Sequence, residues 1–206
     1  EDVFISDNNT GSNVLFKNLG NMDFEEVSFA AGITTSSPTR LPLAADYNND
    51  GCLDLFIGAL SGNSFLYKNN CDGSFTDVTT QSGIVANGGI RGGAWNDVNK
   101  DGFVDLYVGR LTENNYLFQN NGDGTFINVA QNMNASGPQS NGLVMGLSFV
   151  DYDNDGDDDI FITQDGNLGN ILLRKEDAGM FIDMSNSSNV NLPVMGMGVA
   201  VGDYDR

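Results

Sequence analysis

DYNNDGCLDLFIG, residues Asp46 to Gly58, places acidic or amide side chains at alternate positions, turns at a glycine and continues into apolar residues. The pattern returns as DVNKDGFVDLYVG from Asp97 and as DYDNDGDDDIFIT from Asp151, and it begins again as GDYDR at Asp203. The leading aspartates lie 51, 54 and 52 residues apart. A fixed period of this length indicates a repeat architecture.

Each repeat reads as four short strands. In the first full repeat these are LPLAAD before the acidic loop, DLFIG after it, and FLYKN and FTDVT joined by a Gly/Asn/Asp turn. The hairpin turns NNCDGSF and NNGDGTF are favourable because Asn and Gly tolerate positive φ. No segment shows sustained helical periodicity, so we predict an all-β chain.

The strand that precedes each acidic loop alternates bulky and small residues. Trp95, Leu147 and Phe149 stand on one face, and glycines such as Gly92 and Gly146 stand on the other. Sheets with one bulky and one small face stack well on copies of themselves, as the blades of a β-propeller do. We therefore predict about four propeller blades of four antiparallel strands, in one repeat domain over residues 1–206. A β-solenoid or a sandwich is the alternative.

The two ends of the sequence carry parts of one repeat. Its first strand is expected at Gly196 to Gly202, its other strands lie between Val3 and Ser28, and Asp2 takes the place that Asp54 has in the first full repeat. We favour a segment of a larger propeller, whose exposed strand edges would pair with further blades or a neighbouring chain. The alternative is a closed four-bladed ring, which requires Asp2 to lie within coordination reach of Asp203 and Asp205.

Oxygen-bearing side chains stand at positions 1, 3, 5 and 9 of each acidic loop, with glycine at position 6 for the sharp turn. With the backbone carbonyl at position 7, they suit Ca²⁺, a hard cation that takes six to eight oxygen ligands. The predicted ligands are Asp46, Asn48, Asp50, Cys52 and Asp54; Asp97, Asn99, Asp101, Phe103 and Asp105; Asp151, Asp153, Asp155, Asp157 and Asp159; and a partial fourth set, Asp203, Asp205 and Asp2.

The loops begin like an EF-hand but end differently. An EF-hand carries a bidentate Glu at position 12 and helices on both sides, whereas Ile57, Val108 and Ile162 stand at that position and a strand follows. The aspartate at position 9 must then supply the closing carboxylate. Acidic turns without a metal are the alternative, but three complete copies in register favour calcium sites.

These loops, the F-I-G or Y-V-G that follows them and the N-x-G-D-G-x-F hairpins resemble the FG-GAP/VCBS repeats of integrin α-subunit propellers and of many secreted proteins. The resemblance covers essentially the whole chain. It implies a β-propeller with calcium in the hairpin between the first two strands of a blade. It implies no single activity, because the family includes adhesion receptors, carbohydrate-binding modules and a few lyases or dehydratases.

The charge of the chain excludes several partners. It has 28 Asp and Glu against 9 Lys and Arg, for a formal net charge of −19. Such a surface repels nucleic acid and anionic membranes, and its self-repulsion destabilises the compact state unless cations offset it. No apolar run approaches the roughly 20 residues that a membrane-spanning helix needs.

Function has to be read from sites. The chain contains no His, which excludes a Ser-His-Asp triad, a His-ligated zinc and imidazole acid–base catalysis. We favour an extracellular or cell-surface binding or adhesion module with structural calcium and a protein or glycan ligand, rather than an enzyme. The runner-up is a carbohydrate-active propeller enzyme, such as a polysaccharide lyase that uses Lys, Arg or Tyr with a carboxylate.

Two further groups of residues lead to predictions. Cys52 and Cys71 fall in two hairpins that project from the same end of one blade, so we predict a disulfide between them, consistent with an oxidising compartment. Arg40, Arg91 and Arg110 stand near the opposite end, where they could form an anion site for an acidic glycan. Pairing of these arginines with nearby acidic residues is the alternative.

Overall fold

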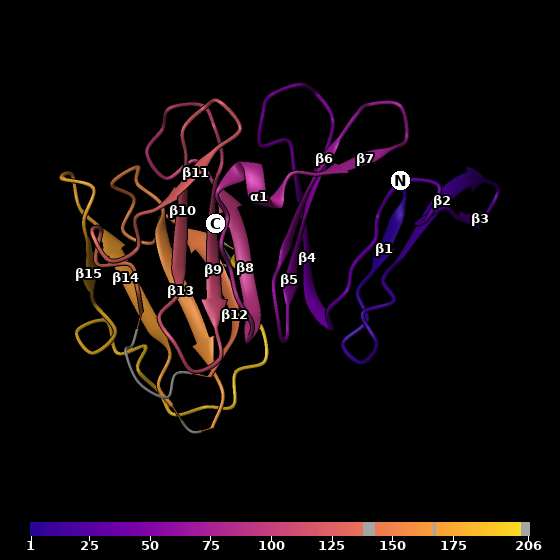
Figure 1. Ribbon diagram of the computed structural model, residues 1–206. Coiled ribbons are helices and arrows are strands. Elements are labelled where there is room, and N and C mark those ends of the chain that lie inside the picture. Colours follow the sequence, from indigo (N-terminus) through magenta and orange to yellow (C-terminus); the bar gives the residue numbers. More distant parts are fainter. Residues whose placement is uncertain (138–142, 167, 203–206) are drawn as a thin grey trace. The chain divides into compact units, whose positions relative to one another are not determined.

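A computed structural model describes residues 1–137, 143–166 and 168–202. The described part is built almost entirely from short strands (Figure 1). These strands are β1 (Val3–Ile5), β2 (Val14–Gly20), β3 (Asp23–Glu26), β4 (Thr39–Ala45), β5 (Asp54–Ala59), β6 (Phe65–Asn69), β7 (Phe75–Asp77), β8 (Ile90–Asn96), β9 (Asp105–Arg110), β10 (Tyr116–Asn120), β11 (Phe126–Asn128), β12 (Val144–Val150), β13 (Asp159–Gln164), β14 (Ile171–Lys175) and β15 (Phe181–Asp183).

Within each sheet the strands follow the order of the sequence. The sheets are β4-β5-β6-β7, β8-β9-β10-β11 and β12-β13-β14-β15, together with a three-stranded sheet β1-β2-β3. Antiparallel pairing links one strand to the next, and Asp54 and Asp159 open their strands opposite Ala45 and Val150. Four consecutive antiparallel strands form the blade of a propeller. The predicted all-β blades are therefore confirmed.

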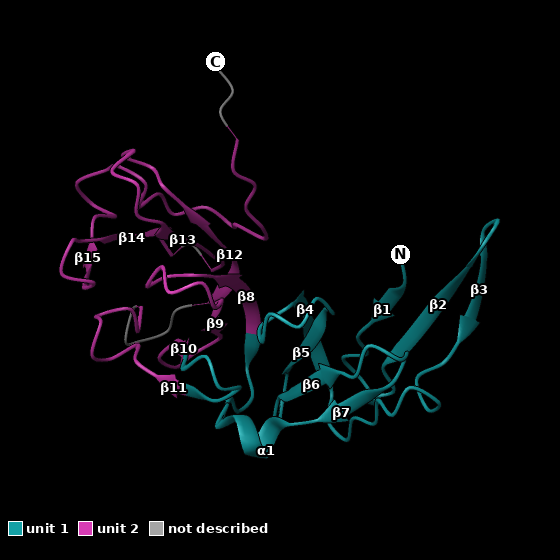
Figure 2. Cartoon of the chain, turned by 90° about the horizontal axis from the view of Figure 1, so that it is seen from above, with its two compact units in different colours: residues 1–90, 120–126 teal, residues 91–119, 127–206 magenta. Residues whose placement is uncertain are grey.

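The chain divides into two compact units (Figure 2). Unit 1 comprises residues 1–90 and 120–126, and unit 2 comprises residues 91–119 and 127–206. Each unit buries an apolar core between two sheets. In unit 1 the core includes Leu15, Ile33, Leu55, Ile57 and Tyr67; in unit 2 it includes Tyr107, Leu117, Val144, Ile160, Ile162 and Leu173. The single domain over residues 1–206 stays a prediction.

Glycines allow the first strands of successive repeats in unit 2 to approach closely. A Cβ added to Gly92 of β8 would lie 3.5 Å from the backbone of Gly146 in β12. A Cβ added to Gly146 would lie 2.9 Å from the Cα atom of Gly198. Real Cβ atoms essentially never come that near another atom. The predicted small face of these strands therefore packs against the backbone of the next repeat.

One local expectation was wrong. The strand predicted at Gly196 to Gly202 is absent, because Gly198 lies over the face of β12, where no ladder of backbone hydrogen bonds can form. One backbone hydrogen bond, from the Gly196 amide to the Gln164 carbonyl at 3.0 Å, ties this segment to the end of β13. In addition, a single helical turn, α1 (Thr79–Ser82), follows β7 and ends at Gly83 in the left-handed conformation.

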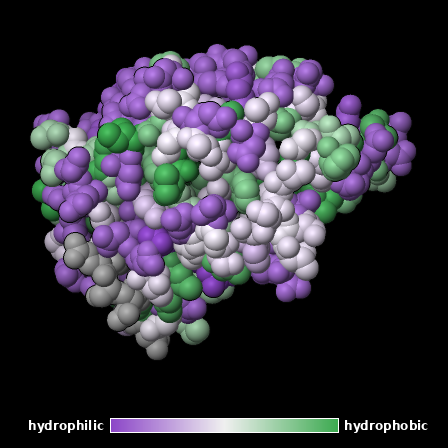
Figure 3. Space-filling model, viewed as in Figure 1, coloured by the Kyte–Doolittle hydropathy of each residue, from purple (hydrophilic) through white to green (hydrophobic). Residues whose placement is uncertain are grey.

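The visible surface is mixed in hydropathy. Figure 3 shows hydrophilic residues and residues of intermediate hydropathy side by side, with hydrophobic residues in small separate groups. Among the described residues, no helix has the length and apolar character needed to cross a membrane.

Candidate metal centres

The three acidic loops share one backbone conformation. Position 4 is left-handed in each, with φ of 58°, 60° and 60° at Asn49, Lys100 and Asn154. Position 6 has φ of 89°, 92° and 92° at Gly51, Gly102 and Gly156. A side chain at position 6 would be strained by this backbone alone, because no other atom lies within 4 Å of the added Cβ. The glycine is therefore needed for the bend itself.

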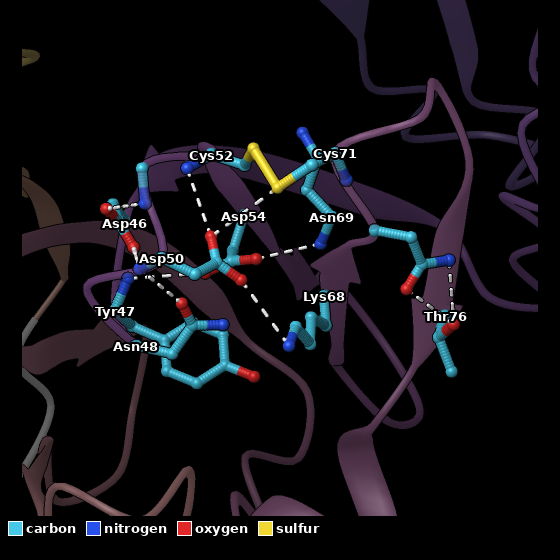
Figure 4. Close-up of polar contacts among 12 residues, drawn as sticks. Asp46, Tyr47, Asn48, Asp50, Cys52, Asp54, Lys68, Asn69, Cys71 and Thr76 are labelled. Atoms are coloured by element: carbon cyan, nitrogen blue, oxygen red, sulfur yellow. Dashed lines mark hydrogen bonds and ion pairs between the residues drawn. A yellow bond between two sulfur atoms is a disulfide. The ribbon is translucent and has the colours of Figure 1, made fainter.

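Side-chain oxygens of the first loop turn into this bend (Figure 4). The carboxylate of Asp46 accepts hydrogen bonds from the amides of Asp50 at 3.0 Å and Gly51 at 2.8 Å. The Asn48 side-chain oxygen also accepts from the Asp50 amide at 3.0 Å, and Asp50 accepts from the Cys52 amide at 3.0 Å. The predicted ligands at positions 1, 3 and 5 are thus brought together by the loop's own amides.

The other two loops repeat these contacts. Asp97 accepts from the amides of Asp101 and Gly102 at 3.0 and 2.8 Å. In the third loop, Asp151 accepts from the amides of Asp155 and Gly156 at 3.2 and 3.0 Å. The equivalence that was inferred from the spacing of the aspartates therefore extends to their hydrogen bonds.

The aspartate at position 9 is buried in all three loops, and Asp54, Asp105 and Asp159 are at most 1% exposed. Asp54 accepts from the amide of Tyr47 in its own loop at 3.3 Å and from the amide of Asn69 in β6 at 2.8 Å. Asp159 accepts in the same way from the amides of Tyr152 at 3.2 Å and Lys175 at 2.8 Å. Asp54 and Asp159 therefore tie their loops to the third strand of the blade.

The same contact identifies the repeat at the start of the chain. Asp2 accepts from the amide of Asn18 at 2.8 Å, as Asp54 accepts from Asn69. Asp2 therefore occupies position 9 of its repeat. Its predicted partners Asp203 and Asp205 lie outside the described residues, so the partial fourth site and the four-bladed ring stay predictions.

The donor set fits calcium best in the third loop. Oxygen atoms of Asp151, Asp153 and Asp159 all lie within 4.8 Å of one another. One ion with Ca–O bonds of about 2.3–2.6 Å can bridge oxygens up to about 5 Å apart. The buried carboxylate of Asp159 still has lone pairs to offer, because each oxygen accepts only one of the two hydrogen bonds described above.

Burial raises the pKa of Asp159, and it raises the pKa of Asp54 to about 6. A nearby cation favours the charged carboxylate and so opposes this effect. A second grouping, Asp50 with Cys52 and Cys71, is not a metal site because its two sulfurs are bonded to each other.

Several cationic side chains approach the loops, which the sequence analysis did not predict. Lys68 lies 3.4 Å from Asp50, and Arg174 lies 4.0 Å from Asp153. Lys100 and Lys175 both pair with Asp157, and the pKa of Asp157 is lowered, chiefly by the hydrogen bond from Lys100. Lys68 stands directly before Asn69, and Arg174 directly before Lys175, whose amides bind the aspartates at position 9. Alignment of the third strands could therefore have revealed these two cations.

The cysteines are joined in a disulfide. The Cα atoms of Cys52 and Cys71 lie 5.7 Å apart, and the bond links the first acidic loop to the hairpin between β6 and β7 (Figure 4). This is the pair expected from the sequence. The bond holds the residue whose carbonyl is the predicted position 7 ligand.

The three arginines have separate surroundings. Arg110 forms an ion pair with Glu113 and stacks its guanidinium over Tyr116, 4.9 Å from the ring centroid. Arg40 belongs to unit 1, whereas Arg91 and Arg110 belong to unit 2. Arg110 thus follows the alternative of local pairing, and convergence of all three arginines on an anion stays a prediction.

Blades of consecutive antiparallel strands with an acidic loop before each second strand define a repeat protein of the FG-GAP type. The family model of the FG-GAP-like repeat matches residues 1–57, 46–108 and 97–162. The chain therefore belongs to the FG-GAP-like repeat family.

Proteins similar to this chain include cartilage acidic protein 1 from two vertebrates. The Xenopus tropicalis protein is 31% identical over 170 residues, which cover 76% of this chain and 25% of that protein. The Homo sapiens protein is 30% identical over 84 residues, covering 41% and 12%. The chain thus spans a quarter or less of the length of these relatives. A solved structure of an Agrocybe aegerita lectin, reported to recognise non-reducing terminal N-acetylglucosamine, is also similar. The match covers 93% of this chain and 55% of the lectin chain, with 18% sequence identity and a TM-score of 0.49.

Proposed function

We propose that this chain is an extracellular binding module whose blades are stiffened by calcium in the loops 46–54, 97–105 and 151–159. The observation that carries the proposal is the convergence of Asp151, Asp153 and Asp159 within 4.8 Å, in a loop whose backbone recurs twice. Calcium in such a loop supplies positive charge between carboxylates and joins the first strand of a blade to the second.

Titration of the intact chain with calcium tests this role. Thermal unfolding in excess chelator should give a lower melting temperature, which calcium restores better than magnesium, because magnesium requires a smaller octahedral shell. Free calcium at about 100 times Kd stabilises by roughly 2.7 kcal/mol per independent site. Calorimetry should count about three ions per chain. A melting temperature that changes with neither chelator nor calcium contradicts the proposal.

A matched pair of variants separates site binding from general charge effects. Asp153→Asn removes one charge from the third loop, and Asp177→Asn removes the same charge from an exposed turn between β14 and β15. Asp153→Asn should lower the number of bound ions or weaken one of them about tenfold or more, since ligand charge tunes affinity. Asp177→Asn should match the parent chain.

The extracellular placement rests on chemistry and on relatives. The Cys52–Cys71 disulfide is of a kind that persists in oxidising compartments. Two relatives are cartilage acidic proteins, and we propose a similar setting for this chain. Fusion of the sequence to a secretion signal should yield protein without free thiols, and recovery only of reduced protein would argue against this placement.

The ligand is proposed to be a protein or a glycan. Arg110, one of the three arginines of the predicted anion site, is engaged by Glu113 and Tyr116, so the test rests on Arg40 and Arg91. The Arg40→Ala and Arg91→Ala double variant should lose binding to acidic glycans while keeping its melting temperature. Equal binding of the variant and the parent chain on a glycan array would contradict the proposed anion site at Arg40 and Arg91.

A further inference from the structure

The second and third acidic loops, both in unit 2, contact each other through a lysine. Lys100 stands at position 4 of the loop 97–105, and its ammonium group donates to the carbonyl of Gly156 at 2.8 Å. The same nitrogen lies 2.7 Å from a carboxylate oxygen of Asp157. Lys100 of one loop therefore contacts two residues of the next loop. Gly156 is position 6, where the chain bends, and Asp157 is position 7, whose carbonyl is a predicted ligand.

Asp157 is held from a second side. Lys175 in β14 lies 3.0 Å from the same carboxylate oxygen, and its backbone amide donates to Asp159 at 2.8 Å. The side chains of Asp157 and Lys175 are only 16% and 8% exposed. Asp157 thus lies between a lysine of its own blade and a lysine of the preceding loop.

The two repeats have another polar contact at this end. Asn96, the last residue of β8, donates to the carboxylate of Asp158 at 2.8 Å. The extra acids of the third loop, Asp157 and Asp158, therefore both bind groups of the preceding repeat. At position 4 of the first and third loops, Asn49 and Asn154 stand in place of Lys100, so neither loop carries a cation there.

We infer that Lys100 couples cation binding in the loop 97–105 to cation binding in the loop 151–159. The inference rests on the proposed calcium function. Lys100 has a left-handed backbone, with φ of 60°, so the fold of its own loop sets the direction of its side chain. An ion that orders the loop 97–105 holds Lys100 against Gly156 and Asp157. The next loop then has less freedom to lose when it binds an ion, and its affinity rises.

The coupling is reciprocal and has a defined sign. Filling either loop favours filling of the other by the same factor. Repulsion between two bound divalent ions opposes this positive coupling and is screened by salt. The calcium titration should therefore be made at about 0.15 M ionic strength. The Lys100 side chain is 58% exposed, and Asp157 still has Lys175 as a partner when Lys100 is replaced, so the Lys100 ion pair contributes little to global stability. Lys100→Met should therefore leave the melting temperature in chelator nearly unchanged.

The amide of Gly156 offers a site-resolved readout, because it donates to Asp151 within the third loop. Its NMR resonance is followed during calcium titration of four intact chains: the parent, Asp101→Asn, Lys100→Met and the double variant. Asp101→Asn weakens the second loop but keeps an oxygen to accept the Phe103 amide. It should raise the calcium midpoint at Gly156 about fivefold or more in the parent background, the lower range of measured couplings. In the Lys100→Met background it should cause no shift.

Two control variants complete the test. Lys17→Met removes an exposed lysine of unit 1 and should leave the fivefold shift intact, and Lys100→Arg should retain part of it. The coupling is overturned if Asp101→Asn leaves the Gly156 midpoint unchanged, or shifts it equally with and without Lys100. If the Gly156 resonance ignores calcium in the parent, the calcium proposal fails and the coupling fails with it.

Discussion

Asp54 illustrates how one residue can serve both a loop and a sheet. Its position in the acidic pattern makes it a predicted calcium ligand, yet its two oxygens also accept hydrogen bonds from the amides of Tyr47 and Asn69. The side chain is 1% exposed, so water cannot replace either hydrogen bond. Such a carboxylate stabilises the blade whether or not an ion is bound.

Replacement of Asp54 by Ala should therefore destabilise the chain even in excess chelator. The buried amide of Tyr47 and the partly buried amide of Asn69 would lose this acceptor, at a cost of about 1–3 kcal/mol for a buried group. We expect urea unfolding, followed by circular dichroism, to show a loss of about 2–4 kcal/mol. Asp54→Asn, which keeps one accepting oxygen, should fall in between. Asp23→Ala, at an exposed position of β3, is the control. Equal stability of Asp54→Ala and this control would show that the hydrogen bonds of Asp54 do not stabilise the blade.

At the residue scale, sequence predicted the ligand positions but not their cationic neighbours. The pattern of Asp46, Asn48 and Asp50 is local, so its geometry follows from one bend of the chain. Lys68 reaches Asp50 from β6, and Lys100 reaches Asp157 from another repeat. These contacts depend on strand register and on the packing of one blade against the next, which a local pattern does not contain.

Strands were the easiest elements to predict, because each repeat supplied an independent copy of the same alternation. Where a hairpin partner follows directly, as β5 follows β4, the expected strand is present. The segment from Gly196 to Gly202 has the same alternation but forms no strand. Residue pattern specifies which face is bulky, whereas a ladder also requires a neighbouring edge.

The close approach of β12 to the residues around Gly198 leads to a prediction for this element. A Cβ at position 146 would lie 2.9 Å from the Gly198 Cα and 3.4 Å from its carbonyl carbon, so backbone would have to move. Gly146→Ala should cost about 1–3 kcal/mol, the usual range for overpacking. The fluorescence of Trp95, the single tryptophan, reports on unit 2 during urea unfolding.

Gly198→Ala is the matched control for this substitution. A Cβ at position 198 would have no neighbour within 4 Å, and neither glycine has the positive φ that disfavours alanine. We expect this variant to unfold like the parent chain. Similar losses for both substitutions would show that chain flexibility, rather than close packing, sets the need for glycine.

The disulfide between the first acidic loop and the β6–β7 hairpin should stabilise unit 1. Its cysteines are 19 residues apart, and closing a loop of that size is worth about 3 kcal/mol in the chain-entropy model. Cys52→Ala with Cys71→Gly should lower the guanidinium midpoint accordingly. Glycine suits position 71 because φ there is 62°, and Gly122 has φ of 76° in the matching hairpin of the next repeat. An unchanged midpoint would show that the bond adds no stability.

For the whole molecule, the dominant fact is a formal net charge of −19 on 206 residues. Sequence predicted the family and the blades from their repetition, and those predictions are confirmed. It could not reveal the two compact units, because their boundary passes through the sheet β8–β11 rather than between repeats. Charge, in contrast, is a property of composition, so its effect on the intact chain can be predicted directly.

Salt and calcium should act on the same repulsion. In chelator, the crowded carboxylates repel one another, and raising the ionic strength from about 0.01 M to 1 M shortens the Debye length from about 30 Å to 3 Å. Sodium chloride should therefore raise the melting temperature of the calcium-free chain. Three bound calcium ions would reduce the formal charge from −19 to −13 and place positive charge where the acids are densest. The salt dependence of the melting temperature should then become clearly shallower with saturating calcium, and equal slopes with and without calcium would mean that the ions do not act by neutralising the loops.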